Sequence, residues 1–335
     1  MLSLILFRCG IVLNKKNTKK IKQTTLFNDE EINAKPFLKW AGGKGQLLGV
    51  ISKKLPTDIK NRKEINSYIE PFVGGGAVFF YLKKHFLVRE STLIDNNKEL
   101  IIGFETIKND PKKLIKKLLS LEQDYLKKSE SKRKEFFYKQ REAYNKQMLD
   151  FDYNQYNNTW IDRTVFLIYL NKTCFNGLFR QNKKGEFNVP FGRYKNPTIC
   201  NEENLLEVHE ALQNTKIICG DFSDAGKFIR GDSFVYFDPP YRPLSSTANF
   251  TDYSSTGFND IEQKRLAKFF KEMDKRGASL MLSNSDPKNE DENDNFFDDL
   301  YKEFKIERIK AKRSISCMGS GRGKINELLI RNYDS

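Results

Sequence analysis

The sequence predicts an α/β fold in which helices cover both faces of a mostly parallel sheet. Strand-like apolar runs alternate with helical segments in the first and last thirds of the chain, which is typical of such sheets. The middle third breaks this alternation and indicates an insertion. With 335 residues, of which 39% are hydrophobic and 13% aromatic, the chain can build a substantial core in one large domain or two modest ones.

The first third contains two predicted strands around a glycine-rich turn. Residues 67–72 (SYIEPF) are predicted to form a buried strand that leads directly into three glycines at positions 74–76. Residues 77–86 follow as a helix with one apolar face. Residues 91–95 form the second short strand, which ends in an acid.

The middle third is predicted to be helical and basic, and then to form a hairpin. A helical pattern covers residues 110–141 and begins with an Asp-Pro pair that suits an N-cap and first turn. Residues 160–170 form a further apolar helix. Phe, Val and Arg alternate over residues 177–194, which indicates a hairpin with a turn near Gly185.

The last third returns to strands and helices. A helix is predicted from the capping pair Asn259 and Glu262 to Gly277. The acidic run over residues 286–299 is expected to be a surface loop. The predicted strands of this part are residues 216–219, 234–237, 279–282 and 327–330.

The net charge favours a polyanionic partner. The chain has 58 Lys and Arg residues against 44 Asp and Glu residues, a formal net charge of +14. Cationic side chains that neutralise phosphates release condensed counterions, which favours binding. A lysine-rich protein without such a partner is an equally open interpretation of the charge alone.

Cysteine and histidine usage argues against metal and disulfide sites. None of the five cysteines belongs to a C-x-x-C pair, so reduced thiols in a cytoplasmic protein are expected. With only two histidines, no metal site is expected. The sequence has no run of about 18 apolar residues, so no membrane span is expected. Residues 1–33 are expected to be a poorly ordered extension, because Arg8 interrupts their apolar run and no cleavage site follows.

Three segments have the chemistry of a cofactor site. The glycine turn lets a ligand lie against the backbone, although its spacing differs from the dinucleotide motif and a structural corner is the alternative. Asp95 ends the next strand, roughly 20 residues after the glycines, where an acid can accept hydrogen bonds from ribose hydroxyls. Residues 36–44 (PFLKWAGGK) place a tryptophan beside two glycines and a lysine, which can cover a ligand and neutralise a carboxylate.

A cluster of hydrogen-bond acceptors, Asp238-Pro239-Pro240-Tyr241, follows the predicted strand 234–237. The two prolines fix the backbone and remove two amide donors, which leaves carbonyls free to accept hydrogen bonds from an amine. The Asp238 carboxylate is a further acceptor and the Tyr241 ring offers a stacking face, so the cluster suits a flipped base with an exocyclic amine. An ordinary proline turn is the alternative, which the strand-end position disfavours.

These motifs resemble, in their order, the Dam family of DNA adenine methyltransferases. The order is KWAGGK, EPFVGGG, a strand-end Asp and DPPY, and the resemblance covers about residues 35–333. Residues 176–197 (NGLFRQNKKGEFNVPFGRYKNP) resemble the family's DNA-reading hairpin, and residues 219–222 (CGDF) resemble its adenosine-contacting motif. The tail GRGKINELLIRNY is similar to enzymes that accompany GATC restriction systems.

The resemblance implies a Rossmann-like methyltransferase sheet with an inserted helical plus β-hairpin DNA-recognition domain. The expected parts are an extension (1–33), a catalytic domain in two pieces (34–105 and 201–335) and a target-recognition domain (106–200). The residues implied for catalysis are Asp238, Pro239 and Tyr241. Those implied for binding S-adenosylmethionine are Trp40, Lys44, Phe72, Gly74, Asp95, Asp221, Phe222 and Asp238. Those implied for DNA binding are Lys39, Asn176, Leu178, Arg180 and Pro190.

The implied reaction is methyl transfer from S-adenosylmethionine to the exocyclic amine of adenine in double-stranded DNA, within GATC. The enzyme would be the modification arm of a restriction–modification system, with the endonuclease as a functional rather than a physical partner. One alternative is a different acceptor amine, in cytosine, RNA or a protein glutamine, although SPPY or NPPY is more typical there. The other is a non-enzymatic DNA-binding protein, which would need neither DPPY nor a cofactor loop.

Overall fold

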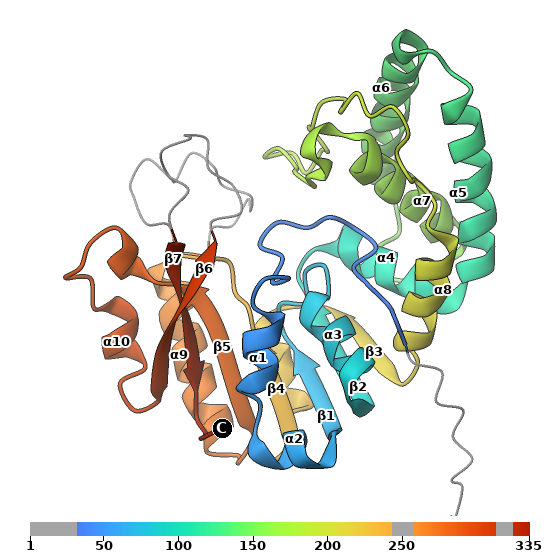
Figure 1. Ribbon diagram of the computed structural model, residues 1–335. Helices are drawn as coiled ribbons and strands as arrows, with labels where there is room; N and C mark the ends of the chain where they lie inside the picture. The colour runs from blue at the N-terminus through green and yellow to red at the C-terminus, as the bar shows by residue number, and fades with distance from the viewer. Residues whose placement is uncertain (1–31, 243–257, 313–323) are drawn as a thin grey trace, which may run out of the picture. The chain divides into compact units, whose positions relative to one another are not determined.

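The computed structural model describes residues 32–242, 258–312 and 324–335 (Figure 1). Within these residues the sheet has seven strands in the order β3-β2-β1-β4-β5-β7-β6. Strands β1 to β5 are parallel, whereas β7 runs antiparallel to both β5 and β6. The strands are β1 Glu64–Glu70, β2 Leu87–Asp95, β3 Thr215–Cys219, β4 Ser233–Phe237, β5 Ser279–Ser285, β6 Lys305–Lys312 and β7 Lys324–Arg331. The predicted α/β class with a mostly parallel sheet is confirmed.

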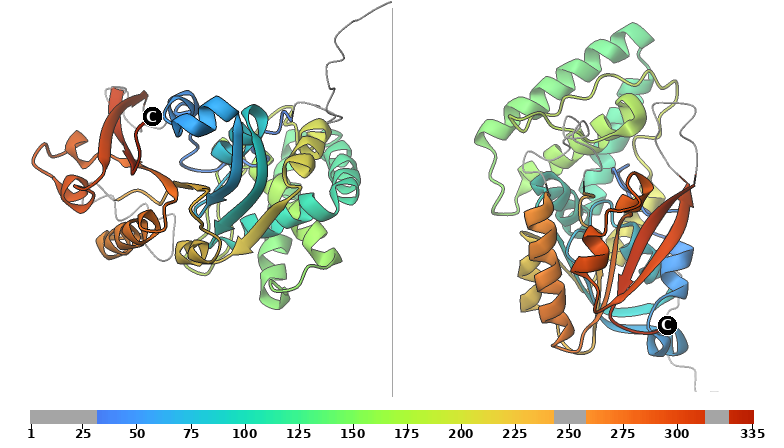
Figure 2. Two further views of the ribbon diagram at one scale, coloured as in Figure 1. Left: turned by 90° about the horizontal axis from the view of Figure 1, so that it is seen from below. Right: turned by 90° about the vertical axis from the view of Figure 1, so that its left-hand side faces the viewer.

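Both faces of the sheet are buried, because alternate side chains of each strand enter two different cores. Along β4, Phe234 and Tyr236 enter the core that contains α1, α3 and α4. Val235 and Phe237 enter the core that α9 and α10 cover, and Figure 2 shows α9 and α1 on opposite sides of the sheet. The helices around the sheet are α1 Leu48–Lys53, α2 Thr57–Arg62, α3 Ala77–His85, α4 Lys98–Asn109, α9 Asp260–Asp274 and α10 Phe296–Leu300. Burial on both faces explains why the central strand β4 (SFVYF) is almost continuously apolar.

A helical segment lies between β2 and β3 in the chain and packs beside α4 (Figure 1). Helix α7 contacts α4, α5 and α6, and α8 contacts α4 and α5. The helices of this segment are α5 Pro111–Leu126, α6 Glu130–Gln147, α7 Asn158–Thr173 and α8 Glu202–Ala211, with short 3-10 turns η1 Met148–Asp150 and η2 Phe175–Gly177. The interruption of the strand–helix alternation therefore lies where the sequence predicts it.

The basic stretch over residues 110–141 forms two helices rather than one, with a break at residues 127–129. The Asp110 side chain does not cap α5. Its carboxylate instead binds the Lys113 ammonium at 2.8 Å and accepts the Tyr156 hydroxyl at 2.7 Å. These partners keep the pKa of Asp110 below its usual value.

The predicted hairpin has its turn at Gly185, but it contains little regular strand. Gly185 has φ +80°, a conformation that favours glycine. The Asn182 side chain closes the turn by accepting from the backbone N–H groups of Lys184 and Glu186. Antiparallel pairing is limited to isolated bridges, Gln181 with Phe187 and residue 174 with residue 191.

The C-terminal part differs from the prediction in three places. β5 continues through the buried polar residues 283–285, because β7 pairs with their backbone. The acidic run is not simply a surface loop: Asp286 is fully buried against Arg308, at 2.9 Å, and Phe297 of α10 lies in the core. Strand β6 was not predicted, because its alternating charged residues suit an edge strand and give no apolar run.

Most of the expected N-terminal extension, residues 1–31, lies outside the described residues. Residues 32 and 33, the end of the expected extension, are described. There the backbone N–H of Asn33 donates to Glu207 of α8 at 2.8 Å. The described cysteines, Cys174, Cys200 and Cys219, are free thiols. Among the described helices, none is long and apolar enough to cross a membrane.

Candidate active site

The carboxyl ends of neighbouring parallel strands bring the predicted site residues to one edge of the sheet. Gly74 follows β1, Asp95 ends β2 and Asp238 follows β4, and these strands are adjacent in the order β2-β1-β4. The backbone N–H of Gly74 donates to Asp95 Oδ2 at 3.0 Å, and that of Asn97 donates to Oδ1 at 2.9 Å. Burial raises the pKa of Asp95, while these hydrogen bonds oppose the rise. The edge is where open α/β sheets bind ligands.

The Trp40 ring lies against the glycine turn. Gly74 has φ +48°, and a Cβ atom there would lie 3.2 Å from Cδ1 of Trp40. On its other side Trp40 stacks on Phe179 of the hairpin, with ring centroids 5.0 Å apart and an interplanar angle of 16°. The tryptophan therefore connects the predicted cofactor loop with the predicted DNA-reading hairpin.

Lys44, Asp238 and Tyr241 form one polar cluster. The buried Lys44 ammonium lies 2.8 Å from Asp238 Oδ1 and donates to the Tyr241 hydroxyl at 2.6 Å. The Tyr241 hydroxyl in turn donates to Glu327 Oε2 on β7 at 2.9 Å. Burial raises the pKa of Asp238, and the nearby Lys44 ammonium acts in the opposite direction. The pKa of Tyr241 is also raised, mainly by burial and then by Asp238, so the phenol is neutral.

Residues from β5 and α9 support this cluster. The Ser283 hydroxyl donates to Asp238 Oδ1 at 3.1 Å, so Oδ1 has two donors, whereas Oδ2 has none among the described residues. The buried Gln263 side chain donates to the Pro240 carbonyl at 3.1 Å. The Pro239 carbonyl has no donor among the described residues. Two acceptors, Asp238 Oδ2 and the Pro239 carbonyl, are thus available to an amine.

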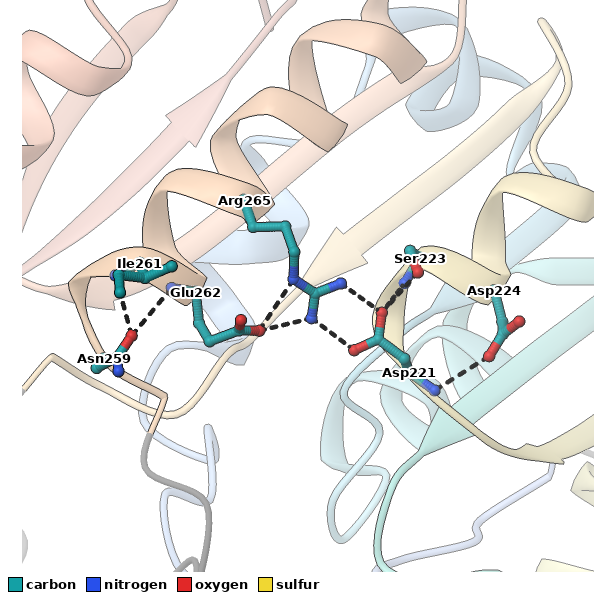
Figure 3. Close-up of polar contacts among 7 residues, drawn as sticks. All are labelled: Asp221, Ser223, Asp224, Asn259, Ile261, Glu262 and Arg265. Carbon is teal, nitrogen blue, oxygen red and sulfur yellow. Dashed lines mark hydrogen bonds and ion pairs between the residues drawn. The ribbon is translucent and has the colours of Figure 1, made fainter.

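Asp221 and Phe222 lie at the start of the turn η3 Phe222–Lys227, after β3 (Figure 3). Asp221 Oδ1 accepts from the backbone N–H and the hydroxyl of Ser223, at 3.0 and 2.6 Å, and Asp224 completes a capping box. Arg265 of α9 forms a two-pronged pair with Asp221, which holds the pKa of that carboxyl well below its usual range.

Phe72 and Phe222 come together although 150 positions separate their numbers in the chain. Their ring centroids are 5.4 Å apart at an interplanar angle of 29°, and Phe258 packs edge-on against Phe72. Phe222 is buried, whereas Phe72 is partly exposed. The rings of Phe72 and Phe222 therefore form an aromatic surface next to Asp221.

The residues predicted to face DNA are gathered by Asn171, a fully buried residue of α7. Its side chain accepts from the Lys39 backbone N–H at 2.9 Å and donates to the carbonyls of Lys39 and Gly177, each at 3.0 Å. Arg180 is exposed, and its Nε donates to Asn188 across the hairpin at 2.8 Å. Asn176 and Pro190 are also exposed, and Leu178 is partly buried.

Comparison with known proteins identifies the family of the chain. The model of the family described as D12 class N6 adenine-specific DNA methyltransferase matches residues 40–315. The chain belongs to this family. It is 50% identical over 303 residues to the type II methyltransferase M.MjaIII of Methanocaldococcus jannaschii, covering 90% of this chain and 100% of the relative. It is also 36% identical to DNA adenine methylases of Vibrio cholerae and Escherichia coli, covering 88% of this chain and 94% and 93% of those proteins.

Membership of this family confirms the predicted resemblance and the Rossmann-like methyltransferase fold. The protein is an adenine-specific DNA methyltransferase, and the alternatives of another acceptor amine or a non-enzymatic DNA-binding protein are excluded. Among the described residues of the methyltransferase, no group of three or more His, Cys, Asp or Glu side chains is placed to hold a metal ion.

Several residues around the site of the methyltransferase were not predicted from its sequence. Asn171, Gln263, Arg265 and Ser283 reach the site from elements without a recognisable motif. Phe179 and Glu327 lie in segments that resemble the family but were not themselves singled out. One signal was available for Ser283: polar residues that directly continue an apolar strand are typical of a ligand-binding edge.

Proposed function

We propose that this methyltransferase transfers a methyl group from S-adenosylmethionine to the exocyclic amine of adenine within GATC in double-stranded DNA. We further propose that it is the modification arm of a restriction–modification system, with an endonuclease as a functional rather than a physical partner. The observation that supports the reaction best is the partly buried Asp238, which is bound on Oδ1 by Lys44 and has no donor on Oδ2 among the described residues. The choice of GATC as the target sequence rests on the resemblance of residues 176–197 and of the C-terminal tail to the Dam family and to enzymes that accompany GATC restriction systems.

The residues at the sheet edge fit S-adenosylmethionine chemically. Asp95 offers acceptors for ribose hydroxyls, and Asp221 offers an acceptor for the adenine amine beside the aromatic pair of Phe72 and Phe222. A side chain at Gly74 would meet the Trp40 ring, so the turn has room for backbone only. The Lys44 ammonium donates to Asp238, Tyr241 and the Gly42 carbonyl, so it offers positive charge rather than a free donor to the carboxylate of the cofactor. When bound, this cofactor supplies a methyl group that is already activated as a sulfonium, so the protein needs mainly to position and polarise the acceptor.

Asp238 and the Pro239 carbonyl accept the two hydrogens of the adenine amine and orient its lone pair. Lys44 keeps the Asp238 carboxylate ionised and occupies Oδ1, which leaves Oδ2 for the amine. The Tyr241 ring offers a stacking face to a base that has left the duplex. The Lys44 ammonium lies 4.5 Å from the centroid of that ring and fixes its position.

We assign DNA recognition to residues 106–200 together with Lys39. The hairpin presents Asn176, Arg180 and Pro190 on its surface, and the buried Asn171 holds it against Lys39. Because Trp40 stacks on Phe179, the recognition segment is joined directly to the cofactor loop. Among the described residues Arg180 is bound only by Asn188, through Nε, so its terminal nitrogens can pair with the two acceptors on the edge of guanine.

A methylation experiment tests the proposal. Purified protein is incubated with plasmid DNA and S-adenosylmethionine that carries a labelled methyl group, and the digested nucleosides are analysed. Label is expected in N6-methyladenine, and single-molecule sequencing should place it within GATC. Activity is expected to survive excess EDTA, since the chemistry needs no Lewis acid. Label in another sequence would reject GATC, and dependence on added magnesium would reject metal independence.

A further inference from the structure

Arg265, on the second turn of α9, pairs with Asp221 (Figure 3) and packs against Phe222, although it belongs to no motif. Its Nη1 and Nη2 atoms donate to Oδ1 and Oδ2 of Asp221, each at 2.7 Å, which is the strong two-pronged geometry of an arginine–carboxylate pair. Its guanidinium carbon lies 4.0 Å from the centroid of the Phe222 ring. One side chain therefore fixes the carboxylate and the aromatic ring together.

Arg265 is itself held in place by its own helix. Glu262 Oε2 accepts from Nε at 3.0 Å and from Nη2 at 2.5 Å, as expected for side chains three residues apart on a helix. The N-cap Asn259 accepts from the backbone N–H groups of Ile261 and Glu262, at 3.0 and 3.2 Å, and so fixes the turn that carries Glu262. The guanidinium is therefore oriented before any ligand binds.

The hydrogen bonds of Asp221 leave one of its oxygens more open than the other. A carboxylate has about four acceptor positions, two on each oxygen. Oδ1 accepts from the Ser223 backbone N–H, from the Ser223 hydroxyl and from Arg265 Nη1. Among the described residues, Oδ2 accepts only from Arg265 Nη2. Oδ2 therefore has a position for one further donor.

We propose that Arg265 is a positioning residue that orients Asp221 so that Oδ2 accepts the exocyclic amine of the cofactor's adenine. The inference rests on the proposed function, in which S-adenosylmethionine is the methyl donor and Asp221 binds its adenine. It extends that function because it assigns α9 a part in selecting the cofactor. A carboxylate fixed in this way accepts from an amine but repels a carbonyl oxygen at the same place.

The role of Arg265 is orientation rather than stability. The side chains of Arg265 and Asp221 are 40% and 45% exposed, and exposed ion pairs contribute little to the free energy of unfolding. A purely structural arginine would affect all ligands of the site equally. A positioning arginine should affect the choice between an amine and a carbonyl, and this difference can be measured.

Isothermal titration calorimetry of the full chain with two ligands provides the test. S-adenosylhomocysteine has the amine, and S-inosylhomocysteine has a carbonyl in its place. The wild type should bind the adenosyl ligand about tenfold more tightly or better, since an unpaired polar group at a built hydrogen-bond site is costly. Arg265→Ala should weaken the adenosyl ligand about tenfold and reduce this preference, whereas Arg265→Lys should retain part of it.

Lys264→Ala is the matched control, because it removes an exposed cation from the same turn of α9 and should leave both dissociation constants unchanged. Equal weakening of the two ligands in Arg265→Ala, or no change, overturns the inference. If Asp221→Asn loses the preference and Arg265→Ala keeps it, only the role of Arg265 is wrong. If Asp221→Asn keeps the preference, the adenine site of the proposed function is wrong. Should Arg265→Ala fail to fold, Glu262→Gln, which loosens Arg265 without removing it, is judged by the same criteria.

Discussion

Asp238 has to be ionised in a buried position if it is to accept a hydrogen bond from the target amine. Burial raises the pKa of its carboxyl group, and the Lys44 ammonium and the Ser283 hydroxyl lower it. Both of these donors contact Oδ1. The protein therefore stabilises the ionised form from one side of the carboxylate and leaves the other side for the substrate.

Asp238→Ala should lower the single-turnover rate of methyl transfer by about a hundredfold or more, because a positioned acceptor is lost from the reacting amine. Cofactor affinity should change little, since Asp95 and Asp221 remain in place. Rapid-quench kinetics and calorimetry measure the two quantities. Asp232→Ala, which removes an exposed carboxylate at the other end of β4, is the control. A near-normal single-turnover rate in the Asp238 variant would remove this residue from the mechanism.

Lys44→Met should shift the acid side of the pH profile of kcat to higher pH. Activity requires ionised Asp238 and is lost as the pH falls through its pKa, which burial has raised. Removing Lys44 takes away a group that lowers this pKa, so the loss begins at a higher pH. Profiles are measured at saturating cofactor and DNA. Lys54→Met, which breaks an ion pair with Glu307 away from the cluster, is the control and should not shift the pH profile. An unshifted profile in Lys44→Met would contradict the role of Lys44 in lowering the pKa of Asp238.

Arg180→Ala should relax sequence choice at one base pair. Loss of a contact with a base edge costs about 1–3 kcal/mol of discrimination at one position, whereas loss of a phosphate contact weakens binding at all sites equally. Methylated plasmids from wild type and variant are mapped by single-molecule sequencing. The variant should also mark sites that differ from GATC at one guanine. Unchanged specificity at a lower rate would mean that Arg180 binds the backbone of the DNA.

The site residues that could be predicted belong to short motifs whose chemistry is local. The structure places Gly74 beside Asp95 because the successive strands β1 and β2 pair in parallel, and Asp221 and Phe222 are adjacent in the chain. Arg265 could not be predicted, because it reaches Asp221 from a helix 44 positions later in the chain. Its role depends on the packing of α9 against η3, which no local pattern of residues determines.

At the scale of elements, prediction succeeded where burial imposes a pattern and failed where it does not. Strands β4 and β5 and the end of β2 are buried on both faces, so their apolar runs could be recognised. The edge strand β6 has alternating charges and could not. The polar end of β5 was not included in the predicted strand 279–282, because its hydrogen bonds come from β7, about 45 residues later in the chain. The hairpin near Gly185 was recognised by its turn rather than by its strands.

The junction of α4 and α7 depends on a buried ion pair. Arg163 Nε donates to Glu99 Oε2 at 2.7 Å and Nη2 donates to Oε1 at 2.5 Å, with side chains only 1% and 4% exposed. Arg163→Met should therefore destabilise the protein by about 3–5 kcal/mol, because it leaves a buried carboxylate without its cation. The double variant Arg163→Met/Glu99→Met should recover most of this loss.

Urea unfolding measures these changes in the free energy of unfolding. Lys117→Ala breaks the exposed pair between α5 and Asp162 of α7 and serves as the control. It should cost less than about 1 kcal/mol, since exposed ion pairs are screened by water and salt. A double variant of the buried pair that is no more stable than Arg163→Met would show that the two residues act independently.

At the scale of the whole molecule, the positive charge is concentrated where it can meet a phosphate backbone. Helices α5 and α6 lie in the segment that we assign to DNA recognition. Their exposed lysines without an acidic partner among the described residues are Lys112, Lys116, Lys132, Lys134, Lys139 and Lys146. Other lysines of these helices are already paired, as Lys113 is with Asp110. The unpaired lysines are the ones available to DNA.

DNA affinity should therefore fall steeply with salt. With roughly five or six phosphate contacts, the logarithm of affinity against the logarithm of salt concentration should have a slope near −5. Replacing Lys132, Lys134 and Lys139 with Gln should reduce the magnitude of the slope by about three, because each lost contact contributes about one. Fluorescence anisotropy with a GATC duplex at several salt concentrations measures the slope. The control replaces Lys264, Lys268 and Lys275, on or next to α9, with Gln. These substitutions change the net charge equally but should leave the slope unchanged. An equal effect of both sets would mean that DNA affinity depends only on the overall charge of the protein.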